Sequence, residues 1–328
     1  MQLIINSYGT YLHIKDDMFE VIVRKDGNRE KHYFSAKKIS SILMSKGTAM
    51  STAAIIKAIK NNIDIVIFEH NGMPVGRFWH SRPGSTTKIR KKQLEASLNV
   101  IGTNWVIKWL GQKLENQIEF LKRLKKHRSQ KSEKIQNSIE KMSDLKTKIS
   151  NSKAEKISEI EGSLRGWEGT AGRIYFALLS ELLTKKYKFD GRSFRPAQDP
   201  FNAFLNYSYG ILYSRVEKAL VIAGLDPYTG FMHRDDYNTK SLVFDFIEPY
   251  RIIAEETVFK LFSAKRVNDS HTDKITNGYS LNAEGKALLT DRFFKFFEEE
   301  KIRYKGKNQS RANALQLDAH AFANSLIK

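Results

Sequence analysis

The amino-acid sequence predicts an α+β multidomain protein, with a small N-terminal β-sheet domain followed by a larger all-α domain. Short runs rich in β-branched and aromatic residues, separated by turn signals, fill residues 1–80. Pro, Gly, Ser and Thr cluster within residues 81–89, which indicates a linker. Apolar residues recur at helical spacing over residues 90–328. A chain of 328 residues is also long for one compact domain, so these ranges are the expected domains.

The expected β domain contains short strands around one helix. The predicted strands are the β-rich runs 3–5, 11–14, 19–23, 32–34, 63–68 and 75–79. The turn signals between them are Asp16-Asp17, Asp26-Gly27-Asn28 and Asn71-Gly72. A helix is predicted over residues 51–61, because Ser51 can cap it and an apolar stripe follows.

The first part of the helical domain carries two apolar stripes. One extends from Val106 to Leu124 and the other from Ile135 to Ile149, and a basic run interrupts them. This pattern predicts either an exposed helical hairpin or one long helix with a polar middle. The basic residues of 122–131 either contact DNA or form a solvated helix face.

The charge balance points to a polyanionic partner. Lys and Arg number 55 against 36 Asp and Glu, a formal charge of +19, although a basic proteome gives the same balance. A hydrophobic content of 41% excludes global disorder. The absence of cysteine excludes disulfides and thiolate chemistry and fits a cytoplasmic location. We expect no signal peptide and no membrane span. The sequence contains no P-loop motif, so it does not support ATP hydrolysis.

Two segments far apart in the chain offer ligands for one metal ion. The first carries Glu168, and the second carries His233, Asp245 and Glu248. Carboxylates with a single imidazole suit Mg²⁺ or Mn²⁺. Asp245 and Glu248 lie in an apolar run, where acids are costly unless they are paired or metal-bound. A divalent-metal site in a strongly basic protein indicates phosphodiester chemistry on nucleic acid.

Each of these residues also has an ordinary structural explanation. Glu168 sits just before an expected helix, where the helix dipole favours an acid. His233 follows a turn-rich loop and is there explained as a polar loop residue. Asp245 and Glu248, three apart, would lie on nearly the same helix face as surface charge.

Four motifs together resemble a known family, the CRISPR adaptation integrases, often called Cas-one endonucleases. They are Trp-Glu-Gly-Thr-Ala-Gly-Arg-Ile-Tyr-Phe at 167–176, an Asp-Pro-x-Asn-x-x-x-Asn-Tyr-x-Tyr-Gly run at 199–210, Gly-Phe-Met-His at 230–233 and Ser-Leu-Val-Phe-Asp-Phe-Ile-Glu-Pro-Tyr-Arg at 241–251. Each motif alone is weak, but they occur in the family's order, and the resemblance covers essentially the whole chain.

The resemblance implies a metal-dependent DNA endonuclease and integrase that inserts new spacers into a CRISPR array by transesterification. It implies Mg²⁺ or Mn²⁺ as cofactor and double-stranded DNA, both protospacer and CRISPR repeat, as substrate. It also implies a homodimer formed through the β domains of residues 1–80 and a complex with a Cas-two-type partner. These are the properties of CRISPR antiviral defence in the cytoplasm.

The resemblance also assigns roles to residues. Glu168, His233 and Glu248 match the metal ligands, and Asp245 matches a further catalytic acid of the hydrogen-bond network. Some relatives have Asp where this chain has Glu248. Basic residues near the motifs are expected to grip phosphates, namely Arg173, Arg195, Lys240 and Arg251. Arg173 and Arg251 are equally explained as partners of buried acids.

The tyrosines of the central motif, Tyr207 and Tyr209, either stack on a base or pack in the core.

Two further functions stay open beside the integrase. One is a stand-alone DNA transposase or repair nuclease with the same site, which the genomic neighbourhood would distinguish. The other is a silent nucleic-acid-binding scaffold, which the acids and the histidine argue against.

Overall fold

The computed structural model describes residues 2–25, 28–39, 41–68, 74–78, 86–233 and 239–328. The chain divides into two compact units, Met1–Pro83 and Gly84–Lys328, and each has its own hydrophobic core. The first is built mostly of strands and the second mostly of helices, so the predicted fold class is confirmed. No helix in these ranges is long and apolar enough to cross a membrane.

The first unit contains two four-stranded sheets and one helix, α1 (Thr52–Lys60). One sheet has the strand order β1-β5-β7-β8, in which β8 alone is antiparallel to its neighbour. The other has the order β4-β3-β2-β6. The strands are β1 (Gln2–Ile5), β2 (Tyr11–Lys15), β3 (Met18–Lys25), β4 (Asn28–Phe34), β5 (Ser41–Ser45), β6 (Ala49–Met50), β7 (Asp64–Phe68) and β8 (Pro74–Phe78).

Local sequence chemistry explains several boundaries of the first unit. Asp16 and Asp17 adopt positive φ angles of 47° and 58°, as a two-residue hairpin turn between β2 and β3 requires. Ser51 caps α1, because its side chain accepts a hydrogen bond from the Ala54 N–H at 3.2 Å. The predicted turns at 26–28 and 71–72 fall wholly or partly outside the described residues.

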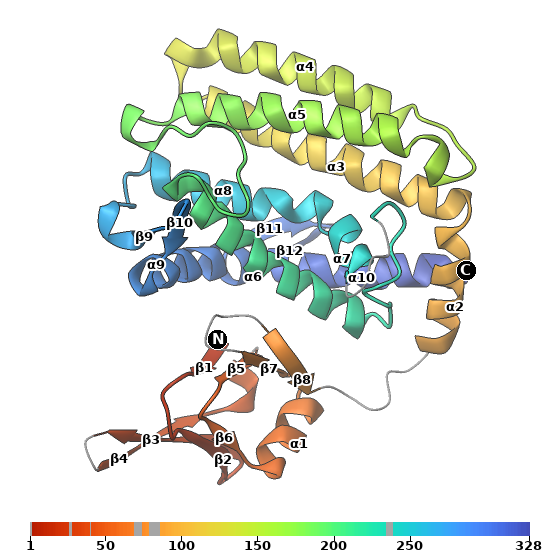
Figure 1. The fold of residues 1–328 in the computed structure, drawn as a ribbon. Coiled ribbons are helices and arrows are strands. Elements are labelled where there is room, and N and C mark those ends of the chain that lie inside the picture. Colours follow the sequence, from red (N-terminus) through yellow and green to blue (C-terminus); the bar gives the residue numbers. More distant parts are fainter. Residues whose placement is uncertain (1, 26–27, 40, 69–73, 79–85, 234–238) are drawn as a thin grey trace. The chain divides into compact units, whose positions relative to one another are not determined.

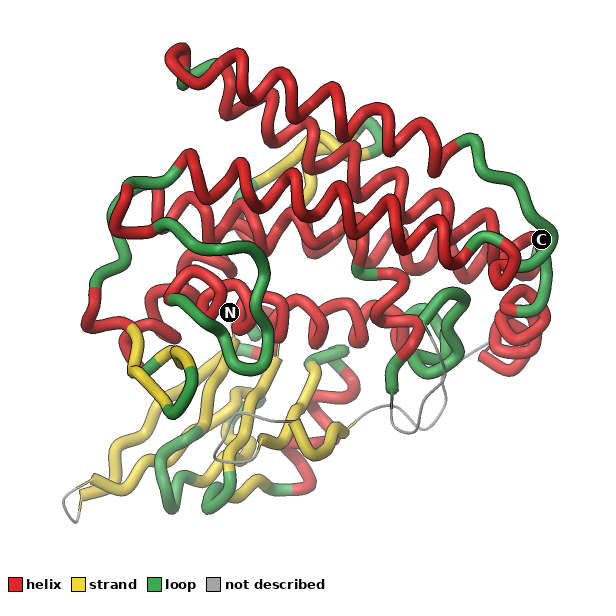
Figure 2. Tube along the Cα trace, turned by 45° about the horizontal axis from the view of Figure 1, so that its top comes forward, coloured by secondary structure: helices red, strands yellow, loops and turns green. Residues whose placement is uncertain are grey.

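The second unit places three long helices side by side (Figure 1). They are α3 (Val100–Lys125), α4 (Ser132–Ser150) and α5 (Glu161–Leu182). The remaining helices pack below them in the same view (Figure 1), and Figure 2 shows the same bundle from a second direction. They are α2 (Thr86–Ser97), α6 (Pro200–Ile222), α7 (Ser241–Phe246), α8 (Arg251–Ser263), α9 (Ala283–Phe294) and α10 (Arg311–Ile327).

The two apolar stripes form a hairpin of two helices, α3 and α4, rather than one long helix. The expectation that this hairpin is exposed is wrong for α3. Helices α4 and α5 cover one side of α3, and the turn before α8 packs against another part of the same helix. These contacts bury Leu110, Leu114 and Leu121. Burial of such apolar stripes is the main stabilising term of this bundle.

The structure corrects two further expectations. Residues 86–89 form the first turn of α2 instead of belonging to the linker, because Thr86 and Ile89 are buried and lie close to Gly224. Residues 81–85 lie outside the described ranges. The second unit is mostly rather than entirely helical, since it holds the hairpins β9 (Thr272–Ile275)–β10 (Gly278–Leu281) and β11 (Lys301–Tyr304)–β12 (Lys307–Ser310).

Candidate metal centre

Glu168 lies in the second turn of α5, because this helix begins at Glu161 rather than after Glu168. The helix-dipole explanation for this acid is therefore wrong, since that effect is confined to the first turn. A Cβ atom built at Gly169 or Gly172 meets nothing within 4 Å. The face of α5 beside Glu168 thus leaves room for a close approach by another backbone or a substrate.

Asp245 of α7 organises the loop that carries His233. Its Oδ2 accepts hydrogen bonds from the backbone N–H groups of Phe231, at 2.6 Å, and Met232, at 3.0 Å. Its Oδ1 accepts from the His233 N–H at 3.2 Å and lies 2.6 Å from His233 Nδ1. Because Asp245 holds Nδ1, the opposite nitrogen of the imidazole, Nε2, is the one left to bind a metal ion.

Gly230 allows this loop to pack against α7. A Cβ atom at Gly230 would lie 2.5 Å from the Cβ of Ser241 and 3.0 Å from Oδ2 of Asp245. Any side chain would therefore push the loop away from the carboxylate that orients His233. This explains why a glycine precedes the histidine in the motif at 230–233.

Glu248 begins η5 (Glu248–Tyr250), a 3₁₀ turn directly after α7. Its Oε1 accepts a hydrogen bond from Arg251 Nε at 2.8 Å. Its Oε2 lies 2.6 Å from Nζ of Lys113, which reaches the site from α3. The same ammonium group contacts the Glu168 carboxylate. Two predicted ligands from distant segments therefore point at one cation.

The electrostatics of the buried pair keep Glu248 ionised. Burial by itself raises the pKa of Glu248, but Arg251 and Lys113 outweigh it and hold this pKa at about 2. Burial lowers the pKa of Lys113, and the carboxylates of Glu248 and Glu168 more than offset this and raise it. The arrangement is a compact set of charges in which every member is paired.

These residues are of the types that bind a divalent ion, but they do not form a complete ligand cage. Among the described residues, no three acidic or histidine side chains gather closely enough to hold a metal. The buried Oε2 of Glu248 receives no hydrogen bond of acceptable geometry in these ranges, although Lys113 lies close to it. The structure brings Glu168 and Glu248 to one group, Lys113, whereas the His233 ring contacts Asp245. Carboxylate oxygens and one imidazole nitrogen are the donor types of a Mg²⁺ or Mn²⁺ site.

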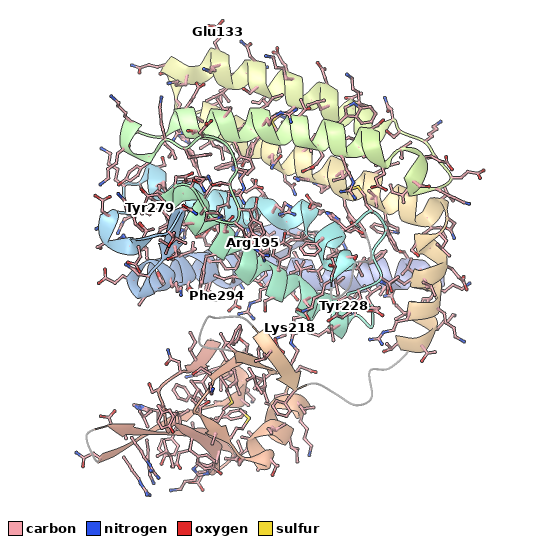
Figure 3. The ribbon with its side chains drawn as sticks, viewed as in Figure 1. Glu133, Arg195, Lys218, Tyr228, Tyr279 and Phe294 are labelled. Atoms are coloured by element: carbon pink, nitrogen blue, oxygen red, sulfur yellow. The ribbon has the colours of Figure 1, made fainter. Side chains whose placement is uncertain are left out.

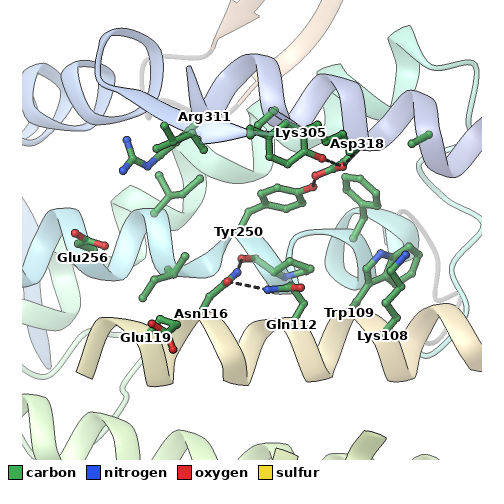
Figure 4. Close-up of a pocket in the computed structure, with 18 of the residues that line it drawn as sticks. Lys108, Trp109, Gln112, Asn116, Glu119, Tyr250, Glu256, Lys305, Arg311 and Asp318 are labelled. Carbon is green, nitrogen blue, oxygen red and sulfur yellow. Dashed lines mark hydrogen bonds and ion pairs between the residues drawn. The ribbon is translucent and has the colours of Figure 1, made fainter. Parts of the chain in front are cut away.

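Hydrogen bonds to α3 and α10 hold the turn that carries Glu248. Asn116 Nδ2 of α3 donates to the Pro249 carbonyl at 2.7 Å, and Tyr250 OH donates to Asp318 Oδ2 at 2.8 Å. Tyr304 OH donates to the other oxygen of Asp318. These groups line a cavity of about 620 Å³ between α3, η5 and α10 (Figure 4). The contacts tie η5 to α3 through Asn116 and to α10 through Asp318.

The four predicted phosphate-binding residues differ in their surroundings. Arg251 pairs with Glu248 and lies over the rings of Tyr209 and Tyr213, at 5.0 and 5.8 Å, which favours the structural explanation. Lys240 pairs with Glu217 at 2.9 Å. Arg173 is exposed and donates to Thr170, and Arg195, exposed in the segment before α6, is labelled in Figure 3. DNA contact by these four stays a prediction.

The central motif fastens the segment before α6. Asp199 caps this helix, accepting from the Asn202 N–H at 2.8 Å. Asn206 Oδ1 accepts from Arg192 at 2.8 Å, and Asn202 Oδ1 accepts from the same guanidinium. Tyr209 packs in the core and donates to Glu255 at 2.8 Å, whereas Tyr207 is partly exposed.

Sequence reasoning missed Lys113 and Arg192. A signal for Lys113 was present, because residue 113 falls between Leu110 and Gln117 on the buried stripe of α3. A lysine on such a stripe needs a buried acidic partner. Arg192 carries no comparable pattern, since the loop alone does not show which side chains it faces.

Comparison with known structures shows which proteins share this fold. A Cas1 protein from Thermotoga maritima matches with a TM-score of 0.77 and 19% identity, over 100% of this chain and 97% of that one. A casposase bound to its integration product matches with a TM-score of 0.75 and 21% identity, over 99% and 90%.

Sequence comparison then gives the family. The model described as CRISPR associated protein Cas1 matches residues 3–295. The CRISPR-associated endonuclease Cas1 1 of Archaeoglobus fulgidus is 29% identical over 97% of this chain and 94% of its own. The CRISPR-associated protein Cas1 3 of Methanobrevibacter ruminantium is 30% identical over 86% and 84%. The chain belongs to the Cas1 family, whose relatives include named CRISPR-associated endonucleases, and the resemblance is confirmed.

Proposed function

We propose that this protein is a divalent-metal-dependent DNA endonuclease and integrase that inserts new spacers into a CRISPR array. The observation that carries the proposal is the convergence of Glu168 and Glu248 on one cationic group, Lys113 Nζ. Membership of the Cas1 family and the formal charge of +19 support a DNA substrate.

In the proposed site, Glu168, Glu248 and His233 would hold Mg²⁺ or Mn²⁺. The ion, when bound, would polarise the scissile phosphate and stabilise charge on its oxygens. Asp245 keeps the imidazole of His233 turned with Nε2 outward. Arg251 keeps Glu248 ionised. The open face of α5 beside Gly169 and Gly172 admits the DNA backbone.

The reaction we propose is transesterification at phosphorus. A protospacer 3′-hydroxyl attacks a phosphodiester at the repeat boundary, a new P–O bond forms, and the existing 3′-oxygen leaves with a proton. With water as nucleophile the same site cuts DNA. The protein supplies no covalent nucleophile, so its contribution is positioning and electrostatic stabilisation.

The proposed partners follow the named relatives and the charge of the chain. Double-stranded DNA is the substrate, and a Cas2-type protein is the partner, since solved structures of a Cas6-RT-Cas1–Cas2 complex share this fold. A homodimer formed through residues 1–80 agrees with the exposed edge strand β4, whose residues are almost all exposed. We place the activity in the cytoplasm, where the chromosomal array lies.

The test is integration of a labelled protospacer duplex into a plasmid that bears the cognate repeat, with and without the Cas2-type partner. Glu168→Ala should abolish integration and cleavage and leave DNA binding largely intact, because basic residues supply most of the affinity. Glu181→Ala, on the same helix and with the same charge change, is the matched control. Wild-type levels of cleavage by Glu168→Ala would refute the assignment.

A further inference from the structure

The side chain of Lys113 is only 8% exposed, and its ammonium group contacts both Glu168 and Glu248. It reaches these acids from α3, a different helix from either of them. A buried lysine is costly unless acids neutralise it, and here two do. Lys113 therefore joins α5 to η5 through the two carboxylates that are proposed to bind metal.

The charges around this contact are balanced without any metal ion. Two carboxylates, Glu168 and Glu248, face two cationic groups, Lys113 and Arg251. Asp245, three residues before Glu248, contacts His233 and the backbone of its loop instead. A divalent ion added to the four paired groups raises their sum from zero to +2, and the repulsion from Lys113 acts at close range in a site of low dielectric constant.

We propose that Lys113 is a built-in cation that occupies the metal-binding carboxylates until metal and a DNA phosphate arrive together. The proposal rests on the function assigned above. Mg²⁺ and Mn²⁺ need the same carboxylate oxygens at short range, so the ion and the ammonium group compete for them. The flexible stem of lysine lets its ammonium group withdraw, whereas Arg251 is kept in place by Tyr209 and Tyr213.

A DNA phosphate reduces the repulsion between the metal ion and Lys113, because it adds a negative charge to the site. It also offers a new acceptor for the ammonium group that the metal displaces. Metal and DNA then strengthen each other's binding by the same factor, as linkage requires. The free protein therefore binds metal weakly and the DNA-bound protein binds it strongly.

The experiment measures Mn²⁺ binding by the decrease of the free-Mn²⁺ electron paramagnetic resonance signal. It uses the full-length protein, alone and with a short duplex whose 3′ ends are dideoxy-terminated. The variants are Lys113→Met, which removes the charge and keeps most of the side chain, and Lys108→Met, an exposed control on the same helix. Glu168→Ala with the same duplex gives the background of Mn²⁺ bound elsewhere.

We expect duplex DNA to tighten Mn²⁺ binding by the wild type roughly tenfold or more. Lys113→Met should bind Mn²⁺ roughly tenfold more tightly than the wild type without DNA and gain less when DNA is added. Its melting temperature should also rise more on addition of Mn²⁺, because the ion then neutralises the Glu168 carboxylate and the Glu248 oxygen that Lys113 no longer contacts.

Equal Mn²⁺ affinity of Lys113→Met and wild type without DNA would overturn the role of Lys113 and leave the metal site intact. Equal Mn²⁺ affinity of the wild type with and without DNA would overturn it as well. This comparison uses only the wild type, so it does not depend on whether a variant folds. Wild-type binding no greater than the Glu168→Ala background, with or without DNA, would instead refute the proposed metal function itself.

Discussion

Replacing Asp245 by asparagine keeps the shape of the side chain and changes only its charge and its hydrogen bonds. The carboxylate now accepts from three backbone N–H groups, of Phe231, Met232 and His233, and also faces His233 Nδ1. An amide has one accepting oxygen and one donating nitrogen. Neither orientation of the amide can therefore satisfy this loop.

The energetic cost of Asp245→Asn depends on which of the two orientations its amide group adopts. With the oxygen towards His233, the buried N–H groups of Phe231 and Met232 lose their acceptor, at about 1–3 kcal/mol each. With the nitrogen towards His233, the imidazole must accept at Nδ1 and carry its proton on Nε2, which removes the lone pair proposed for the metal. Loss of such an orienting carboxylate weakens metal binding about 10- to 100-fold.

The assay is a Mn²⁺ titration in the presence of duplex DNA, together with urea denaturation of the same samples. Asp245→Asn should lose stability if the amide oxygen faces His233. It should lose Mn²⁺ affinity if the amide nitrogen faces His233. Asp144→Asn, on the exposed face of α4, makes the same charge change as a control. An Asp245→Asn protein with unchanged stability and unchanged Mn²⁺ affinity would refute this reasoning.

Three further predictions concern acid stability, assembly and DNA affinity. Because the folded-state pKa of Glu248 is lowered to about 2 from 4.5, its ion pairs stabilise the fold above pH 4.5 and are lost as the pH falls towards 2. In Glu248→Gln, the free energy of unfolding measured in urea should change less with pH between 4.5 and 2 than in the wild type. An unaltered pH dependence would contradict the pairing. The isolated helical unit, residues 84–328, should be monomeric in light scattering, and a stable dimer would locate the interface there. Replacing Lys125, Lys126 and Arg128 by glutamine should flatten the slope of log K against log salt by up to roughly 2.7, and an unchanged slope would assign the run to a solvated face.

Local signals predicted most elements of the first unit correctly. The Asp16-Asp17 turn and the Ser51 cap depend on side-chain chemistry within a few residues, so the sequence shows them directly. The start of α5 was misplaced for the opposite reason. Ile160 supplies no capping hydrogen bond and glycines follow, and the helix forms because Leu164 is buried against its neighbours.

The site was predicted in part. Asp245 and Glu248 stood out because acids in an apolar run need a partner, whereas Glu168 was assigned through its motif. The partners themselves come from elsewhere in the chain, as Lys113 does from α3. The two hairpins of the second unit escaped prediction because their strands are four residues long and mostly polar.

The most direct test of the metal centre is anomalous diffraction at the manganese edge from crystals grown with duplex DNA and Mn²⁺. We predict a peak within coordination distance of the carboxylates of Glu168 and Glu248 and of His233 Nε2, with the Lys113 ammonium group moved away. A manganese peak on a different set of residues, or one that leaves out any of these three ligands, would contradict the proposal.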